Sequence, residues 1–398
     1  MKRIIIFTGK GGVGKTSTAA AHALKASMEG IRTLIVSTDM AHNLSDIFMQ
    51  EVKNEPTEIR ENLWGLEIDP NYEMENYYGS IQAAFKKMMA FKDEKQIENF
   101  EDIVVFPGME ELFCLLKIKD LHDKGIYDLI IVDSAPTGET ISLLKFPELM
   151  SWYMEKLFPI GKVALKVLRP ISKMAFNIDM PDKQAISDIE KLYVMLSELQ
   201  KLLKDRDSCS IRLVTIPEKM VIEETKRNYM YLNLYNFNVD AIYINRILPQ
   251  DIENGFFDEW KSIQKKYMEE IDSVFLNLPR FKIKWYEVDI NGISGLERIV
   301  RDSLNVKDIF KVQKITFNER FEKIKGGYKL KVYVPFADKK GLELYETGAD
   351  ISIKIGNFKR NIPCPNSLRK YSISKADFNE DYLSIYFSDS SEEGKLNE

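Results

Sequence analysis

Short runs of apolar residues alternate, over most of the chain, with longer segments that mix apolar and polar positions. The runs predicted to be buried parallel strands are Arg3–Thr8, Thr33–Ser37, Asp128–Asp133, Ile211–Ile216, Ala241–Asn245 and Ser273–Leu278. The segments between them are long enough for helices, and this alternation predicts an α/β fold built on a doubly wound, mainly parallel sheet. In such folds ligands bind at the carboxyl ends of the strands.

Two stretches depart from this alternation. Residues 148–205 are rich in leucine, methionine and aromatic side chains and contain Pro159 and Pro170, a pattern that predicts a helical insertion. Beyond residue 312, short β-like runs separated by turns predict a small all-β domain, a sandwich or a partial barrel: Tyr328–Pro335, Leu342–Glu346, Asp350–Ile355, Asn357–Ile362 and Leu383–Phe387. We therefore expect an α/β domain over residues 1–311, the β domain over 312–390 and a disordered tail over 391–398.

The apolar residues of the insertion, and a second Met-rich set near residues 72–100, have two interpretations. Apolar side chains at helical spacing usually form core, and periodicity alone favours that interpretation. Methionine also suits a surface that accepts varied apolar partners, so an exposed groove is the alternative. The second set comprises Ile81, Ala84, Phe85, Met88 and Met89.

The composition is that of a folded soluble protein. Of the 398 residues 44% are hydrophobic and 29% are charged, and a net charge of −5 gives no reason to expect nucleic-acid binding. Cys114, Cys209 and Cys364 include no C-x-x-C pair, so neither a disulfide framework nor an intrachain zinc site is indicated. Because no apolar run suits a membrane span or a signal peptide, we expect a cytoplasmic chain that does not span the membrane.

A glycine-rich segment, Gly9–Ser17, separates the first predicted strand from an alanine-rich helix former. Its sequence GKGGVGKTS satisfies the G-x-x-x-x-G-K-[ST] pattern of a phosphate-binding loop, whose backbone N–H groups and helix N-terminus surround phosphates. Lys15 is placed to reach the β- and γ-phosphates and Thr16 to ligate Mg²⁺, which predicts binding of ATP or ADP with Mg²⁺. The residues expected to contact nucleotide here are Gly11, Gly12, Val13, Gly14, Lys15, Thr16 and Ser17.

A second lysine, Lys10, lies near the start of the same loop. If the loop has the usual shape, a side chain at this position points away from its own phosphates. Lys10 is therefore placed to serve the nucleotide of a facing subunit. The alternative is a solvated surface charge.

Polar residues follow three of the predicted strands. Asp133 ends the run Leu-Ile-Ile-Val, where a carboxylate can belong to the Mg²⁺ shell; a strand-end cap is the alternative. Asp39 follows the second strand and is placed to orient the attacking water. Asn245 and Arg246 are also expected to contact nucleotide: Asn245 carries an amide that can pair with adenine, with an ordinary loop contact as the alternative. The residues expected to carry hydrolysis are Asp39, Lys10 and Lys15.

Together these motifs resemble the ArsA/tail-anchored-protein-targeting ATPase family of deviant Walker A P-loop NTPases. The resemblance covers about residues 1–310 and rests on KGGVGKTS (10–17), STDMAHNLSD (37–46), PGMEE (107–111), DSAPTG (133–138), VTIPE (214–218) and Asn245-Arg246, in the family's order. It implies a homodimer in which Lys10 contacts nucleotide across the interface, Asp39 polarises water, Asp133 belongs to the Mg²⁺ shell and Asn245 reads adenine. The β domain resembles the α-crystallin-like module of some bacterial members.

The chain also departs from the family's pattern. Met40 replaces the usual proline after the switch aspartate, and Glu139 stands where histidine is usual. Arsenite-pump members commonly have two fused halves and a cysteine cluster that binds the metalloid, whereas this chain has one phosphate loop and scattered cysteines. It also lacks the C-x-x-C pair with which eukaryotic targeting members bind an intersubunit zinc.

Three functions are compatible with these features. The favoured one is ATP hydrolysis by a nucleotide-gated homodimer coupled to a hydrophobic client helix or membrane protein, since the insertion matches the location of the family's client groove. The alternative is a soluble ATPase that drives arsenite or anion efflux through a membrane pump. In the third, hydrolysis is incidental to a nucleotide-dependent switch or chaperone whose client binder is the β domain.

Overall fold

The computed structural model describes most of the chain. The described residues are 2–39, 43–76, 109–134, 183–253, 255–315, 318–347, 350–365 and 371–389, with positions 141, 142, 144, 145, 148 and 368. Met40, Glu139, the Met-rich set near residue 85, most of the expected insertion and the expected tail lie outside them. The chain divides into two compact units, one of Met1–Ile5, Ala19–Cys209 and Asn291–Leu296, the other of Ile6–Thr18, Ser210–Ile290 and Glu297–Glu398.

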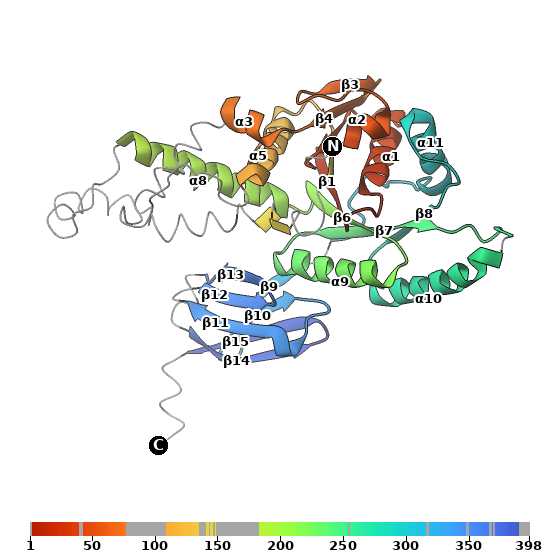
Figure 1. The fold of residues 1–398 in the computed structure, drawn as a ribbon. Coiled ribbons are helices and arrows are strands. Elements are labelled where there is room, and N and C mark those ends of the chain that lie inside the picture. The colour runs from red at the N-terminus through yellow and green to blue at the C-terminus, as the bar shows by residue number, and fades with distance from the viewer. Residues whose placement is uncertain are drawn as a thin grey trace, which may run out of the picture. The chain divides into compact units, whose positions relative to one another are not determined.

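An eight-stranded sheet of order β3-β4-β2-β5-β1-β6-β7-β8 confirms the predicted α/β architecture (Figure 1). Its pairings are parallel from β4 through β2 to β5 and from β6 through β7 to β8, and β3 runs antiparallel to β4. Strands β1, β2, β5 and β6 are buried at every residue, because both faces of an inner strand are covered. The strands are β1 (Arg3–Thr8), β2 (Thr33–Ser37), β3 (Thr57–Arg60), β4 (Leu63–Glu67), β5 (Leu129–Asp133), β6 (Cys209–Thr215), β7 (Val239–Ile247) and β8 (Arg280–Lys284).

The predicted strand at Ser273–Leu278 is wrong. Helix α10 (Asp258–Val274) continues through Ser273, and the chain then turns before β8 begins at Arg280. Ile271, Phe275 and Leu278 are all buried, and their spacing of three and four residues is that of one helix face continued into the turn. The true strand, RFKIK, escaped prediction because it carries charged residues, with one fully buried position, Ile283.

The other helices mostly follow strands, as the predicted alternation requires. They are α1 (Lys15–Met28), α2 (Asn43–Phe48), α3 (Pro70–Asn76), α5 (Met109–Lys124), α8 (Lys183–Lys204), α9 (Lys219–Leu234) and α11 (Gly292–Ser303). Short 3₁₀ turns, η1 (Gly255–Phe257) and η2 (Lys339–Gly341), precede α10 and β11. Within the described ranges no helix is both long enough and apolar enough to cross a membrane.

The C-terminal region is a small β sandwich, as the sequence predicts. One antiparallel sheet has the order β14-β15-β10-β9 and the other β11-β12-β13. Leu330, Ile353 and Ile385 are fully buried between them. The strands are β9 (Glu319–Ile324), β10 (Gly327–Tyr333), β11 (Leu342–Thr347), β12 (Asp350–Ile355), β13 (Phe358–Pro363), β14 (Tyr371–Asn379) and β15 (Tyr382–Asp389).

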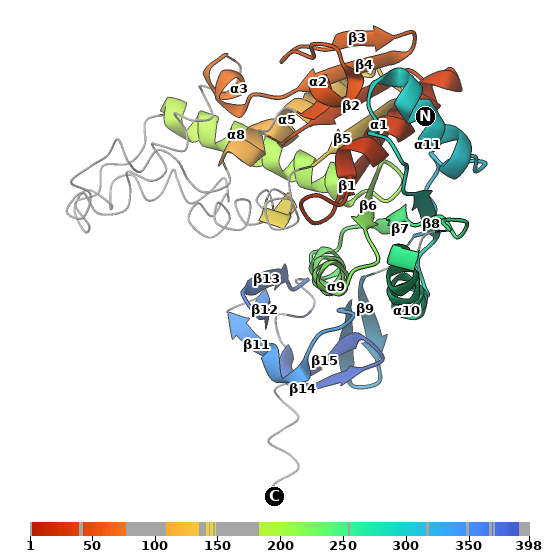
Figure 2. The same cartoon turned by 45° about the vertical axis from the view of Figure 1, so that its right-hand side comes forward.

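Helix α9 and this sandwich share one hydrophobic core. Figure 2 shows α9 beside the strands of the sandwich. Met230 and Leu234 of α9 are buried in the same cluster as the sandwich residues. The guanidinium of Arg360, on β13, donates to the Leu234 carbonyl at 2.6 Å and pairs with Glu319 at 2.7 Å. Because a helix end leaves carbonyls without intrahelical partners, Arg360 completes the C-terminus of α9 from the sandwich.

We expect Arg360→Ala to lower the free energy of unfolding by about 3 kcal/mol, because it leaves a buried carbonyl and a largely buried carboxylate without their donor. Denaturant titration measures this loss. Lys359→Ala is the matched control, since the Lys359 side chain is exposed and its change is expected to stay within about 0.5 kcal/mol. Equal effects of the two substitutions would show that Arg360 does not hold the sandwich to α9.

Candidate nucleotide site

The phosphate loop leaves β1 in close contact with the backbone of β6. A Cβ atom on Gly9 would lie 2.2 Å from the carbonyl oxygen of Val214. No side chain fits at that distance, so the loop can start here only with glycine. The first residue of the sequence motif is thus fixed by packing rather than by phosphate.

Asn245 fixes the other end of the loop. Its side-chain amide donates to the Val13 carbonyl at 2.9 Å, and its amide oxygen accepts the backbone N–H of Arg246 at 2.8 Å. Gly14, at φ +87°, leaves room for this amide, because a Cβ atom there would lie 2.2 Å from its nitrogen. This is a loop contact of the kind that sequence analysis gave as the alternative for Asn245, although its partner, far away in the chain, could not be predicted; the contact between Asn245 and adenine stays a prediction.

The two lysines of the loop occupy different environments. Lys15 is buried, and its ammonium donates to the Lys10 carbonyl at 3.4 Å, so it lies within the curve of the loop. The Lys10 side chain is 37% exposed and its ammonium lies 3.6 Å from a carboxylate oxygen of Glu224, on α9. One amine thus lies inside its own loop, and the other is held at the surface.

The beginning of α1 completes the loop. Thr16 and Ser17 lie in its first turn, and Thr18 closes the turn by donating its hydroxyl to the Gly14 carbonyl at 2.7 Å. The unpaired N–H groups of a helix start favour anions, and no acidic residue lies in this first turn to compete with them. The start of α1 is therefore suited to an anion, and the phosphate contacts of residues 11–17 stay a prediction.

In the other unit, Asp39 and Asp133 come from neighbouring strands. Ser37 and Asp133 are register partners at the ends of β2 and β5. Asp133 is 1% exposed and its carbonyl accepts the N–H of Thr38 at 3.0 Å, while Asp39 donates its N–H to the Ser37 hydroxyl at 3.2 Å. The structure thus brings both predicted carboxylates to the same end of the β2–β5 pair.

Glu67, at the end of β4, holds the start of α2 (Asn43–Phe48). Its carboxylate accepts the N–H groups of Leu44 and Ser45 at 2.8 and 3.0 Å, at the start of α2. A carboxylate at this end of a helix is favourable, and here it is also 6% exposed. Sequence analysis missed Glu67, although an acidic residue ending an apolar run was the available signal.

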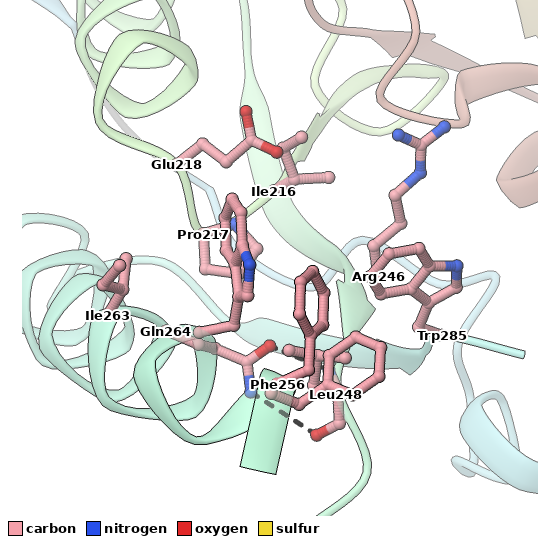
Figure 3. Close-up of a pocket in the computed structure, with 11 residues that line it drawn as sticks. Ile216, Pro217, Glu218, Arg246, Leu248, Phe256, Ile263, Gln264 and Trp285 are labelled. Atoms are coloured by element: carbon pink, nitrogen blue, oxygen red, sulfur yellow. Dashed lines mark hydrogen bonds between the residues drawn. The ribbon is translucent and has the colours of Figure 1, made fainter. Parts of the chain in front are cut away.

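An aromatic pocket of about 280 Å³ is lined in part by Arg246, the residue after Asn245 (Figure 3). Figure 3 shows Arg246 beside Trp285, with Phe256 and Leu248 on the side of α10. The lining residues are Ile216, Pro217, Glu218, Arg246, Leu248, Phe256, Phe257, Trp260, Ile263, Gln264 and Trp285. Flat apolar walls with one guanidinium suit a planar ring system. Sequence analysis missed Trp260 and Trp285, because neither of these exposed residues belongs to a recognisable motif.

The described residues include no group of three histidine, cysteine or acidic side chains that converge as metal ligands. Cys114 and Cys209 are buried, and burial raises the pKa of the Cys364 thiol to about 11. Because metals bind thiolates rather than thiols, Cys364 is a poor ligand at neutral pH.

We expect Gly14→Ala to weaken nucleotide binding about tenfold more than Gly12→Ala. Gly12 has φ +80° and Gly14 has φ +87°, so alanine carries a backbone cost at both positions. A Cβ atom at Gly12 meets open space, whereas one at Gly14 would collide with the Asn245 amide. The difference isolates displacement of Asn245. Titration with a fluorescent ADP analogue measures it, and equal losses would contradict the clamp formed by Asn245.

Comparison with known proteins identifies the family to which this chain belongs. Residues 2–304 match the family model described as anion-transporting ATPase, and residues 325–387 match an HSP20-like domain found in ArsA. The second match agrees with the resemblance of the β domain to an α-crystallin-like module.

Relatives align over nearly the whole chain. A protein from Chlorobaculum tepidum, named for driving an arsenical pump, is 36% identical over 97% of this chain and 96% of its own. A similarly named Aquifex aeolicus protein is 33% identical over 97% and 100%. A Paramecium tetraurelia protein named ATPase ASNA1 homolog 1 is 31% identical over 77% and 93%. With its phosphate loop and these matches, the chain belongs to the ArsA family of anion-transporting ATPases and is itself an ATPase.

Proposed function

We propose that this ATPase works as a cytoplasmic homodimer in which Lys10 of each subunit completes the nucleotide site of the other. Opening and closing of the dimer would then be coupled to handling of a hydrophobic client, such as a membrane-protein segment. Family membership and the similarity to the Paramecium tetraurelia protein named ATPase ASNA1 homolog 1 support this proposal. The client itself is inferred from the resemblance to targeting ATPases.

The different positions of the two lysines carry the proposal. Lys15 already occupies the inside of the loop, so a second amine is not needed there to hold the same phosphates. Lys10 is held at the surface by Glu224, with 37% of its side chain exposed. A cation presented in this way suits a nucleotide approaching from outside the subunit.

Hydrolysis in this scheme depends on charge neutralisation. Asp39 would orient the attacking water and Asp133 would belong to the Mg²⁺ shell, but carboxylates beside a γ-phosphate repel it. Mg²⁺, Lys15 and the partner's lysine would offset that repulsion. A single subunit supplies only part of this positive charge, so the rate should depend on dimer closure.

The oxygen donors expected at the metal site fit Mg²⁺. This ion usually binds through one or two carboxylates, waters and the substrate's phosphates rather than through a cage of side chains. The Thr16 hydroxyl and the Asp133 carboxylate are such donors. We further propose that the adenine ring lies against the aromatic pocket beside Arg246 and Trp285.

We expect Lys10→Ala to lower kcat about 10²- to 10³-fold, the effect of removing one donor aimed at developing negative charge, while ATP affinity of the single subunit is retained. Steady-state ATPase assays and nucleotide titration separate the two quantities. Lys219→Ala, which removes an exposed lysine from the start of α9, should keep the normal rate. A Lys10→Ala protein that hydrolyses ATP normally as a monomer would refute the proposal.

The names of the bacterial relatives raise a second candidate, a soluble engine for arsenical efflux. Soft metalloids require converging thiolates. Cys114 lies within α5 and Cys209 at the start of β6, both buried. These positions favour packing roles over metalloid binding.

Antimonite should therefore leave the steady-state ATPase rate unchanged, since the described residues offer it no cluster of thiolates. Titration of antimonite at saturating ATP is the measurement, with Cys114→Ser as the comparison variant. Stimulation that disappears in Cys114→Ser would favour the efflux function instead.

A further inference from the structure

Among the described residues, the carboxylate of Glu224 lies next to the ammonium of Lys10. The two side chains are 27% and 37% exposed, with 3.6 Å between the ammonium nitrogen and a carboxylate oxygen. At this exposure the pair contributes little to folding. It does restrict a long side chain that otherwise has many rotamers. The contact is thus better suited to placing the Lys10 ammonium than to stabilising the fold.

The helix that carries Glu224 is fixed to the sheet beside the phosphate loop. The hydroxyl of Thr225, the next residue, contacts that of Thr215 at 3.0 Å, at the end of β6. β6 is also the strand whose Val214 carbonyl closes on Gly9. Lys226 ties α9 to α10 by an ion pair with Glu270 at 2.7 Å. The Glu224 carboxylate therefore follows any displacement of α9.

The other half of the same helix lies in the core of the β sandwich. Met230 and Leu234 belong to that core, and the ring of Tyr231 lies 3.8 Å from that of Phe358 between centroids. Tyr235, immediately after α9, donates its hydroxyl to the Lys359 carbonyl at 3.0 Å. From Glu224 to Leu234 the helix rises only about 15 Å. One rigid element thus contacts both Lys10 and the sandwich.

The chain between the ATPase region and the sandwich is also pinned. Buried Arg212 donates to the Ile309 carbonyl at 2.6 Å and pairs with Asp240. Asn238 donates to the Lys314 carbonyl at 3.0 Å, and Asn318 donates to that of Phe237 at 2.7 Å. A sandwich that served only as a tethered client binder would not need these buried contacts.

We propose that Glu224 is a positioning residue for Lys10 and that the β sandwich sets its position through α9. A ligand or client that shifts the sandwich would then change the rate of hydrolysis. This inference rests on the proposed function, because Lys10 must act on the facing subunit's nucleotide for its placement to matter.

The test measures kcat and KM for ATP in Glu224→Gln and Tyr231→Ala, singly and together. Glu224→Gln should lower kcat about fivefold, the upper range for an exposed pair, with KM unchanged. Glu224→Asp should recover part of the rate because it keeps the charge. Tyr231→Ala should lower kcat about threefold, and the double variant should be no slower than Glu224→Gln alone.

Two matched controls separate positioning from general damage. Glu223→Gln removes the neighbouring carboxylate, which is 46% exposed and faces Lys226. Lys359→Ala removes an exposed side chain but keeps the backbone carbonyl that accepts the hydrogen bond from the Tyr235 hydroxyl. Both should keep the normal kcat. If Tyr231→Ala does not fold, Tyr235→Phe keeps the ring, removes only the hydroxyl, and takes its place.

An unchanged or raised kcat in Glu224→Gln would overturn the inference, as would effects of Glu224→Gln and Tyr231→Ala that simply multiply. Failure of the proposed function looks different. If Lys10→Ala hydrolyses ATP at the normal rate, the homodimer scheme itself is wrong. If Lys10→Ala is inactive while Glu224→Gln is normal, only the positioning role is wrong.

Discussion

Backbone contacts at the two ends of the phosphate loop fix its curve, so that Lys15 lies inside the loop and Lys10 lies at the surface. Gly9 closes on the Val214 carbonyl at one end, and Asn245 holds the Val13 carbonyl at the other. Between these contacts the loop curves around Lys15 and leaves Lys10 at the surface beside Glu224. The proposed division of work between the subunits follows from this curve, because each loop keeps one amine and presents the other.

The β sandwich belongs to the same structural unit as the loop. Helix α9 contacts the sheet through Thr225, which hydrogen-bonds to Thr215 of β6, and is buried against the sandwich at Met230 and Leu234. Because the helix packs against both the sheet and the sandwich, a displacement of the helix changes its contacts with both. The HSP20-like domain is therefore well placed to influence hydrolysis.

Strong patterns of apolar residues predicted most of the fold, and the elements that were missed have physical reasons. Inner strands such as β1 and β5 are buried at every position and contain an unbroken run of four apolar residues, so the sequence identifies them. Strand β8 has charged positions and β14 is largely exposed, so neither forms an apolar run. The run Ser273–Leu278 instead ends a helix, since a short apolar stretch does not distinguish a strand from a buried helix end.

The candidate site was predictable where a local motif defines it and unpredictable where the fold assembles it. The spacing of glycines, lysine and threonine in residues 9–17 is enough to predict a phosphate-binding loop. The pairing of Lys10 with Glu224, the clamp by Asn245 and the support of α2 by Glu67 join residues distant in sequence. Such contacts leave no periodic trace in a single sequence, because they depend on how strands are ordered in the sheet.

Intersubunit complementation tests the central claim most directly. Subunits carrying Lys10→Ala, which keep Lys15, are mixed with subunits carrying Lys15→Ala, which keep Lys10, and ATPase activity is measured once mixed dimers have been verified. If Lys10 acts across the interface, each mixed dimer contains one complete site, and the mixture should recover about a quarter of the normal rate from two inactive parents. Mixed dimers that form but stay inactive would contradict the account, since that is the result expected if both lysines serve their own subunit.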